Sequence, residues 1–447
     1  FTAAGNVIDL SSTYQQLDIY ENMFSNALTG TLLITDTNNI VMNAPITGQE
    51  FLSFKITTPG LDNVSLDFTE NLMVVYKIDA RIAERGNEVF QLHFCSPESL
   101  RDDRTRLSKS YVDNVSDIVK KVLKDPRALN TNKELFIEKT KGIKKIISPN
   151  KNPYSLIRDL TTDAISINGS PNYVFFENTD GIHFRTLDSL YAQGSIGDFI
   201  ASDKGSIDFQ KGGITNIEED LKRVLDYNIV SNNDTKKNIK SGMLASKTIS
   251  YNIFQKNYSV RRYDYFSDFN KYSRVSNDFS YDNPIYNKAP IDEYGNNLGD
   301  FKDARIFLHS KSEDLGGKDA QHYYKGGEVT TYETNDVAKT ISHRFAKHTE
   351  LDFGVKINME INGNTTINTG SVIDFLLPIS GTKHVSIDGV INKDTFDIYN
   401  SGKFLITKSR HSFTSLGKRH KIYLSAVKDS FQRKLPEGTG DAIEPRG

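Results

Sequence analysis

The feature that most constrains the fold of this chain is an alternation of apolar and polar residues in two distant parts of the sequence. In the first part, apolar residues recur at roughly every second position between turns rich in Asn, Thr and Gly. This period is typical of strands that bury one face. Roughly seven such strands, closely spaced, close most naturally into a small antiparallel barrel or sandwich. The residues that carry the pattern include Leu28, Leu32, Ile34, Ile40 and Met42.

The same alternation returns near the end of the chain. It begins at Leu351 and continues to a turn at Asn362-Gly363-Asn364. Further strands are predicted at 370–378, 399–411 and 421–429, because each stretch combines β-branched or aromatic residues with flanking turn residues. The end of the chain therefore predicts a second barrel-like region.

Between the two alternating regions the period becomes helical. Apolar residues from Tyr111 to Leu123 fall at helical spacing, and Asp125-Pro126 is expected to end that helix. A second helix is predicted to start at Asn152-Pro153, with proline in its first turn. A short turn of helix is also expected at 21–27, between the first strands.

A hairpin is predicted immediately after the second helix. Its strands are Tyr173–Glu177 and Ile182–Arg185, and they are separated by four residues that end in Asp180-Gly181. Glycine at this place supplies the positive φ that a tight turn needs. Helices and hairpin together indicate an α/β domain.

The stretch 246–344 is polar, rich in Tyr, Asp and Asn, and interrupted by the pairs Gly316-Gly317 and Gly326-Gly327. Interface cores favour Tyr and Arg, so a loop-rich insertion that meets other proteins fits this composition. A solvated excursion fits it equally well, and the sequence leaves both interpretations open.

These patterns predict an α+β fold, mainly β, with two small antiparallel β-barrel domains of similar fold and inserted α/β and loop-rich domains. At 447 residues the chain is long enough for two to four domains. The predicted domains are a first β-barrel at 1–107, an α/β domain with helices and a hairpin at 108–212, a second β-barrel at 213–245 plus 345–431, a peripheral insertion at 246–344 and a flexible C-terminal arm at 432–447.

The charge balance argues against general nucleic-acid binding. Lys and Arg total 55 against 57 Asp and Glu, whereas such binders normally show a basic excess. A local basic patch occurs at 139–151, and a solvated strand edge is the preferred interpretation of it. We expect no membrane insertion, because no apolar stretch approaches the eighteen or so residues of a membrane span.

No catalytic, cofactor-binding, metal-binding or nucleic-acid-binding residue is predicted, and the chain is not expected to be an enzyme or to need a cofactor. The known nucleotide, hydrolase and zinc motifs are absent from the sequence. Cys95 follows an apolar strand and is expected to be a buried, inert thiol. His343 and His348, with His322 upstream, are expected to be exposed loop residues rather than metal ligands. Glu218-Glu219 is interpreted as an exposed helix start rather than a glycosidase pair.

Several motifs in this sequence resemble those of the central hub proteins of contractile-tail phage baseplates, which are related to the hub part of type VI secretion spikes. The resemblance covers most of the chain and is weakest at 246–344 and in the C-terminal arm. It is carried by IDLSSTYQQLDIYENMFSNALTGTLLITDTNNI at 8–40, YVFFENTDGIHFRTL at 173–187, NIKSGMLASK at 238–247, and GSVIDF, SGKFLITKSRH and YLSAVKDS between 370 and 430.

The resemblance implies a structural role in the virion. Hub proteins of this kind are homotrimers whose two tail-tube-like barrels per chain form a pseudo-sixfold ring. The expected partners are the central spike protein, the tail tube protein, the baseplate wedge proteins and possibly the tape-measure protein, with DNA only passing through the lumen. The expected location is the tail baseplate, assembled in the host cytoplasm.

Two other functions stay open from sequence. The β-rich body and the Tyr-rich insertion also fit a receptor- or carbohydrate-binding tail protein. A cell-wall hydrolase is the third possibility, although no acid–base pair or nucleophile arrangement in the sequence supports it.

Overall fold

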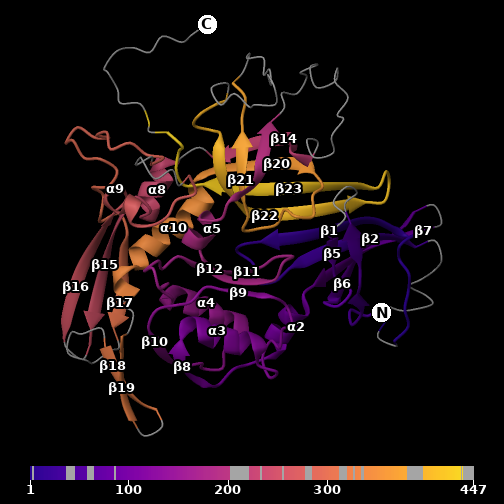
Figure 1. Ribbon diagram of the computed structural model, residues 1–447, viewed down its shortest axis with the longest axis horizontal. Coiled ribbons are helices and arrows are strands. Elements are labelled where there is room, and N and C mark those ends of the chain that lie inside the picture. The colour runs from indigo at the N-terminus through magenta and orange to yellow at the C-terminus, as the bar shows by residue number, and fades with distance from the viewer. Residues whose placement is uncertain are drawn as a thin grey trace.

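The computed structural model is mainly β, and its largest element is one 11-stranded sheet (Figure 1). None of the helices in the described part of the chain is long and apolar enough to cross a membrane. The structure describes residues 1–2, 5–36, 46–57, 65–84, 87–201, 221–231, 234–253, 256–276, 284–311, 320–325, 328–333, 337–379, 396–433 and 435.

Six strands of the large sheet form a closed barrel. The ring closes because β21 pairs with both β13 and β22. The barrel is mixed rather than antiparallel, since β13 lies parallel to both of its neighbours. Its strands, in ring order, are β21 (Val372–Leu376), β13 (Ser195–Ala201), β14 (Arg223–Ser231), β20 (Val355–Asn362), β23 (Arg419–Lys428) and β22 (Gly402–Thr414).

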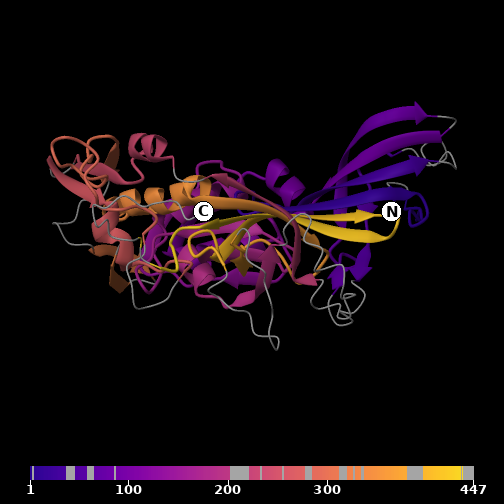
Figure 2. The same ribbon diagram turned by 90° about the horizontal axis from the view of Figure 1, so that it is seen from above.

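The N-terminal strands continue the same sheet outward from the barrel. The first of them, β1, pairs with the second half of β22, from Lys408 to Thr414, after β21 has paired with the first half. Figure 2 shows the β22–β23 hairpin reaching from the barrel to these strands. They are β1 (Tyr14–Asn22), β2 (Thr29–Asp36), β7 (Asn87–Cys95), β6 (Met73–Glu84) and β3 (Phe51–Leu52), and the hairpin β4 (Lys55–Thr57) with β5 (Ser65–Asp67) packs against them.

The prediction of two antiparallel barrels therefore needs correction. Within the described residues the N-terminal strands form an open sheet, in which no strand plays the closing part that β13 plays in the barrel. Phe1 exchanges two backbone hydrogen bonds with Phe51 of β3 at the open side. Residues 21–27 also differ from expectation, because β1 continues to Asn22 and a hydrogen-bonded reverse turn, closed by Ser25 N–H donating to the Asn22 carbonyl, follows in place of a turn of helix.

The two halves of the large sheet nevertheless repeat one strand order. We call β1, β2, β3, β6 and β7 the N-terminal unit and β14, β20, β21, β22 and β23 the C-terminal unit. We number the five strands of each unit in the order in which the chain forms them. In the sheet they then lie side by side in the order first, second, fifth, fourth, third, and every neighbouring pair is antiparallel. The irregularities repeat too. The first strands are bulged at Gln15 and Leu225, and the fourth strands at Tyr76 and Thr407.

An α/β domain lies between the two units in sequence. The predicted start holds for the helix at Pro153, but the helix predicted from Tyr111 starts only at Val115. Tyr111 and Val112, expected in that helix, belong to a strand paired with β10. The elements are α2 (Pro97–Arg104), β8 (Ser110–Asn114), α3 (Val115–Lys124), β9 (Leu135–Ile137), β10 (Ile143–Ile147), α4 (Pro153–Asp163), β11 (Tyr173–Glu177), β12 (Ile182–Thr186) and α5 (Leu187–Tyr191).

The predicted hairpin is confirmed as β11 and β12, with Tyr173 opposite Thr186 and Glu177 opposite Ile182. Gly181 has a φ of 152°, and a Cβ there would lie 2.4 Å from the carbonyl oxygen of Glu134. Only glycine fits this place without a shift of the backbone.

The stretch expected to be rich in loops contains regular structure as well. The three-stranded sheet β16-β15-β17 packs on α10, where the hydroxyls of Thr248 and Ser342 lie 2.6 Å apart. Helix α8 precedes this sheet. The elements are α8 (Thr235–Ser241), β15 (Ala245–Asn252), β16 (Asn257–Asp264), α9 (Tyr265–Asp268), the 3-10 turn η1 (Phe269–Lys271), β17 (Ile306–Lys311), β18 (Ala320–Lys325), β19 (Glu328–Glu333), the 3-10 turn η2 (Val337–Lys339) and α10 (Ile341–Phe353).

The packing of β23 gives a direct test of the strand assignment. Leu424 is buried in the barrel core, whereas its neighbour Tyr423 is on the opposite, polar face of the strand. Leu424→Asp is expected to cost about 3 kcal/mol, because it buries a charge without a partner. Tyr423→Asp, the matched control, should cost about 1 kcal/mol. Urea denaturation of both variants checks this, and equal losses would refute the assigned orientation of β23.

Candidate functional site

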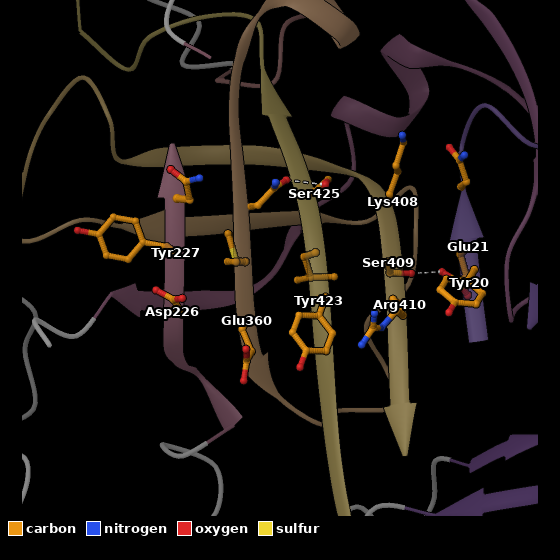
Figure 3. A pocket seen from close by; sticks show the side chains of 15 residues that line it. Tyr20, Glu21, Asp226, Tyr227, Glu360, Lys408, Ser409, Arg410, Tyr423 and Ser425 are labelled. Carbon is orange, nitrogen blue, oxygen red and sulfur yellow. Dashed lines mark hydrogen bonds between the residues drawn. The ribbon is translucent and has the colours of Figure 1, made fainter. Parts of the chain in front are cut away.

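The candidate functional surface is the polar face of the large sheet, where β14, β20, β23, β22 and β1 lie side by side. The strands alternate, so that Met359 and Leu424 enter the barrel core while their neighbours face outward. A shallow depression of about 570 Å³ lies on this face (Figure 3). Its polar lining includes Tyr20, Asp226, Asn228, Asn358, Glu360, Lys408, Arg410, Tyr423 and Ser425.

The side chains of this face are held by their cross-strand neighbours. Ser425 donates to Asn358 Oδ1 at 2.6 Å, and Lys421 Nζ lies 2.5 Å from Glu360 Oε1. The guanidinium of Arg410 lies over the ring of Tyr423, 4.4 Å from its centroid, as the two labelled side chains show in Figure 3. Such pairs are the usual unit of sheet stabilisation.

Acidic and basic groups are interleaved across this face. Asp18 on β1 lies 3.8 Å from Arg410 Nε on β22, and its carboxylate accepts a 2.8 Å hydrogen bond from Gln16. Glu360 on β20 is opposed by Lys421 on β23. The face is therefore polar but carries no concentration of positive charge, and a phosphate backbone would find little to hold it.

Glu21 fixes the point where the two units and the α/β domain meet. It is buried and accepts hydrogen bonds from the backbone of Thr369 at 2.6 Å, from that of Thr179 at 2.8 Å, and from Ser409 Oγ at 2.8 Å. Burial raises the pKa of Glu21 above its ordinary value, against these hydrogen bonds. The residue ties β1 to the β11–β12 turn and to β22.

Glu177 makes a second buried link. It accepts from Lys133 Nζ at 2.5 Å, from Ser96 Oγ at 2.7 Å and from the backbone of Leu28 at 3.1 Å, and Lys133 also donates to Glu98 at 2.8 Å. Both glutamates join segments far apart in sequence. Sequence reasoning missed them, and the only signal for Glu177 was a charged residue that ends an otherwise apolar strand.

Within the described residues, no group of three or more His, Cys, Asp or Glu side chains could hold a metal ion. Cys95 is buried, as predicted, and burial raises its thiol pKa to about 11, which disfavours the nucleophilic thiolate.

The prediction of exposed loop histidines is wrong for His343 and His348, because both lie on helix α10. His343 is buried and packs against Tyr272, with ring centroids 3.8 Å apart and the ring planes tilted by 34°. Burial lowers the pKa of His343 well below its usual value. His322 falls in β18, and Glu218-Glu219 lies outside the described residues, as do residues 434 and 436–447 of the predicted arm.

The basic segment 139–151 is the edge of a small sheet. Strand β10 pairs there with β8, and Lys144 lies 3.1 Å from Asp163. Lys151 makes an ion pair with Asp159. These acidic neighbours favour the interpretation of a solvated edge over a nucleic-acid site.

Comparison with known proteins finds similarity at the level of structure. No family model and no curated protein matches the chain. The 43 kDa tail protein of prophage MuSo2 from Shewanella oneidensis is 8% identical over 93% of this chain and 94% of that one, with a TM-score of 0.50. The tail protein from Neisseria meningitidis MC58 is 9% identical over 93% of each chain, with a TM-score of 0.49.

A third structure comes from the E. coli type VI secretion system, and its protein is described as structurally similar to the T4 tail proteins gp27 and gp5. It is 9% identical over 95% of this chain and 76% of that one, with a TM-score of 0.39. Over 93% of its length, the chain described here is thus similar in structure to phage tail proteins, and it shares the fold of the MuSo2 tail protein.

Proposed function

We propose that the chain is the hub subunit of a phage tail baseplate, a homotrimer that joins a threefold central spike to the sixfold tail tube and starts tube assembly. The observation that carries this proposal is the strand order repeated in the N-terminal and C-terminal units. Three copies of a chain with two like units can present six similar units around one axis. Such a ring can meet a threefold partner on one side and a sixfold partner on the other.

The polar face fits the wall of a channel in this assembly. It continues without interruption from the C-terminal unit onto β1 of the N-terminal unit, because β1 and β22 are hydrogen-bonded neighbours. Its interleaved charges give DNA little to bind, which suits passage rather than retention. The proposed role is therefore structural, in the virion tail, without enzymatic activity. Its partners would be the spike, tube and wedge proteins and the tape-measure protein, after assembly in the host cytoplasm.

Light scattering on the purified protein tests the assembly. The expected mass is three times the 50.3 kDa of one chain. Averaged electron-microscope images should show threefold symmetry with six similar lobes around a channel. A protein that stays monomeric at its highest soluble concentration would contradict the proposed trimer, and degradation of peptidoglycan would contradict a purely structural role.

A further inference from the structure

We infer that copies of this chain join through a specific strand ladder, in which the outer edge of β14 in one copy pairs antiparallel with the outer edge of β6 in the next. This inference rests on the proposed trimer and adds which edges meet and in which register. One chain already contains a junction of the same kind between its own two units.

The two units are joined within the chain by β1 and β22. β1 is the first strand of its unit, and β22 is the fourth strand of the other. The ladder uses only the second half of β22, because β21 occupies the first half. The strands that correspond to β1 and β22 in the opposite units are β14 and β6. If one repeated rotation relates each unit to the next around the ring, every junction must join the first strand of one unit to the fourth strand of its neighbour. The junction between copies therefore joins β14 of one copy to β6 of the next.

The edges of β6 and β14 have the form that this junction needs. Pairing of β3 with β6 ends at Val74, as pairing of β21 ends in the first half of β22. Pairing of β13 with β14 ends at Val224. In the described part of the chain no strand continues either of these edges. Long strand edges without a neighbouring strand are rare in monomeric proteins, because they promote pairing with a strand of another chain.

Exposed apolar side chains gather on the same two strands. Tyr76 and Ile82 on β6 are 46% and 61% exposed, and Tyr227 and Val230 on β14 are 37% and 50% exposed. Figure 3 shows Tyr227 on the side of β14 that faces away from β20, where its ring also contacts that of Phe375, with centroids 5.7 Å apart. Burial of these four side chains in a seam between copies would remove apolar surface that each copy leaves in water.

The shared bulges set the register on β6. In the C-terminal unit, Thr407 bulges and Arg410 follows three residues later, opposite Tyr423. In the N-terminal unit, Tyr76 bulges and Asp79 follows three residues later, opposite Gln91. Asp79 is therefore the counterpart of Arg410.

The register on β14 follows in the same way. Tyr20 of β1 is opposite Arg410 in the chain's own junction. The bulges at Gln15 and Leu225 make Val230 the counterpart of Tyr20, to within one residue because β14 has a further irregularity there. The seam therefore places Val230 of one copy opposite Asp79 of the next, with neighbouring Cβ atoms about 5 Å apart.

A thiol cross-link tests this pairing. The double variant Val230→Cys with Asp79→Cys, treated with a short bismaleimide, should give covalent dimers and trimers on a denaturing gel. Each single variant should give no cross-linked product, because the two edges differ and a head-to-tail seam needs one thiol from each. Native Cys95 is buried and stays in every variant. The control pairs Asp79→Cys with Leu308→Cys on β17, a position more exposed than Val230, and should not cross-link.

The outcomes separate the seam from the trimer. Cross-linking of the double variant alone supports the seam. A trimer by light scattering without this cross-link overturns the seam and leaves the hub proposal standing. Dimers from either single variant would show that two identical edges meet across a two-fold axis, and this would also overturn the seam. A protein that stays monomeric overturns both proposals.

Discussion

Replacing Asp429 with Asn is expected to lower the free energy of unfolding by about 3–5 kcal/mol. The Asp429 carboxylate is buried, and it accepts from Lys347 Nζ at 2.6 Å and from the backbone of Val275 at 3.0 Å. Arg274, also buried, lies 3.4 Å away and is shared with Glu350 at 2.7 Å. Without the charge of Asp429, two buried cations would share one carboxylate.

Chemical denaturation measures this loss. The control is Glu360→Gln, which removes the partner of the more exposed Lys421 and should cost about 0–1 kcal/mol. Adding Lys347→Met to Asp429→Asn should restore part of the stability, because it removes the cation left without its partner. A loss below about 1 kcal/mol for Asp429→Asn would show that the cluster is far better solvated than this structure implies.

Three buried histidines are expected to contribute about 4–6 kcal/mol of destabilisation between pH 7 and pH 5. His343 and His348 add to this loss in the same sense, because burial lowers the pKa of each well below its usual value. Burial lowers the pKa of His183 to about 3, of His411 to about 4 and of His420 to about 3. His183 is stacked between Phe136 and Phe176, with ring centroids 4.5 and 4.8 Å away.

The sign follows from proton binding. In the unfolded chain each histidine takes up a proton as the pH falls through about 6.5, whereas the folded protein keeps it neutral until the lower pKa is reached. The unfolded state therefore binds more protons across this window, and stability falls as the pH falls. His411 Nδ1 and His420 Nε2 lie 3.3 Å apart, so neither can gain a proton cheaply.

Buried Glu21 and Glu350 act in the opposite sense, because burial raises their pKa and protonation then favours the folded state. The test therefore compares variants. Urea denaturation at pH 7 and pH 5 should show a loss for the wild type that shrinks by about 2 kcal/mol in His183→Gln. An unchanged loss would mean that His183 reaches solvent in the folded state.

Local features of this fold could be predicted from sequence wherever neighbouring residues decide them. The β11–β12 hairpin was predictable because Gly181 must have positive φ, and helix α4 because Pro153 suits a first turn. Helix α3 was predicted too long, since Tyr111 and Val112 fit either period and only their pairing with β10 makes them a strand.

The candidate site was beyond such reasoning. Alternation in β20 and β23 indicated a polar face, but not that β1 would extend it, because Tyr20 meets Arg410 across 390 positions of sequence. His343 was misjudged for a related reason. Nothing in its neighbours reveals that Tyr272 will cover it.

By itself the sequence determined that the chain is mainly β, where most strands and turns lie, and which face of each strand is buried. The tertiary structure decided the order of the strands, the closure of one barrel and not the other, and the charge state of the buried groups. The physical reason is that a period of two records whether a side chain meets water or apolar neighbours. The period of two does not indicate which strand will be a given strand's neighbour in the sheet. Strand pairing and the desolvation of charged groups depend on residues that only the folded chain brings together.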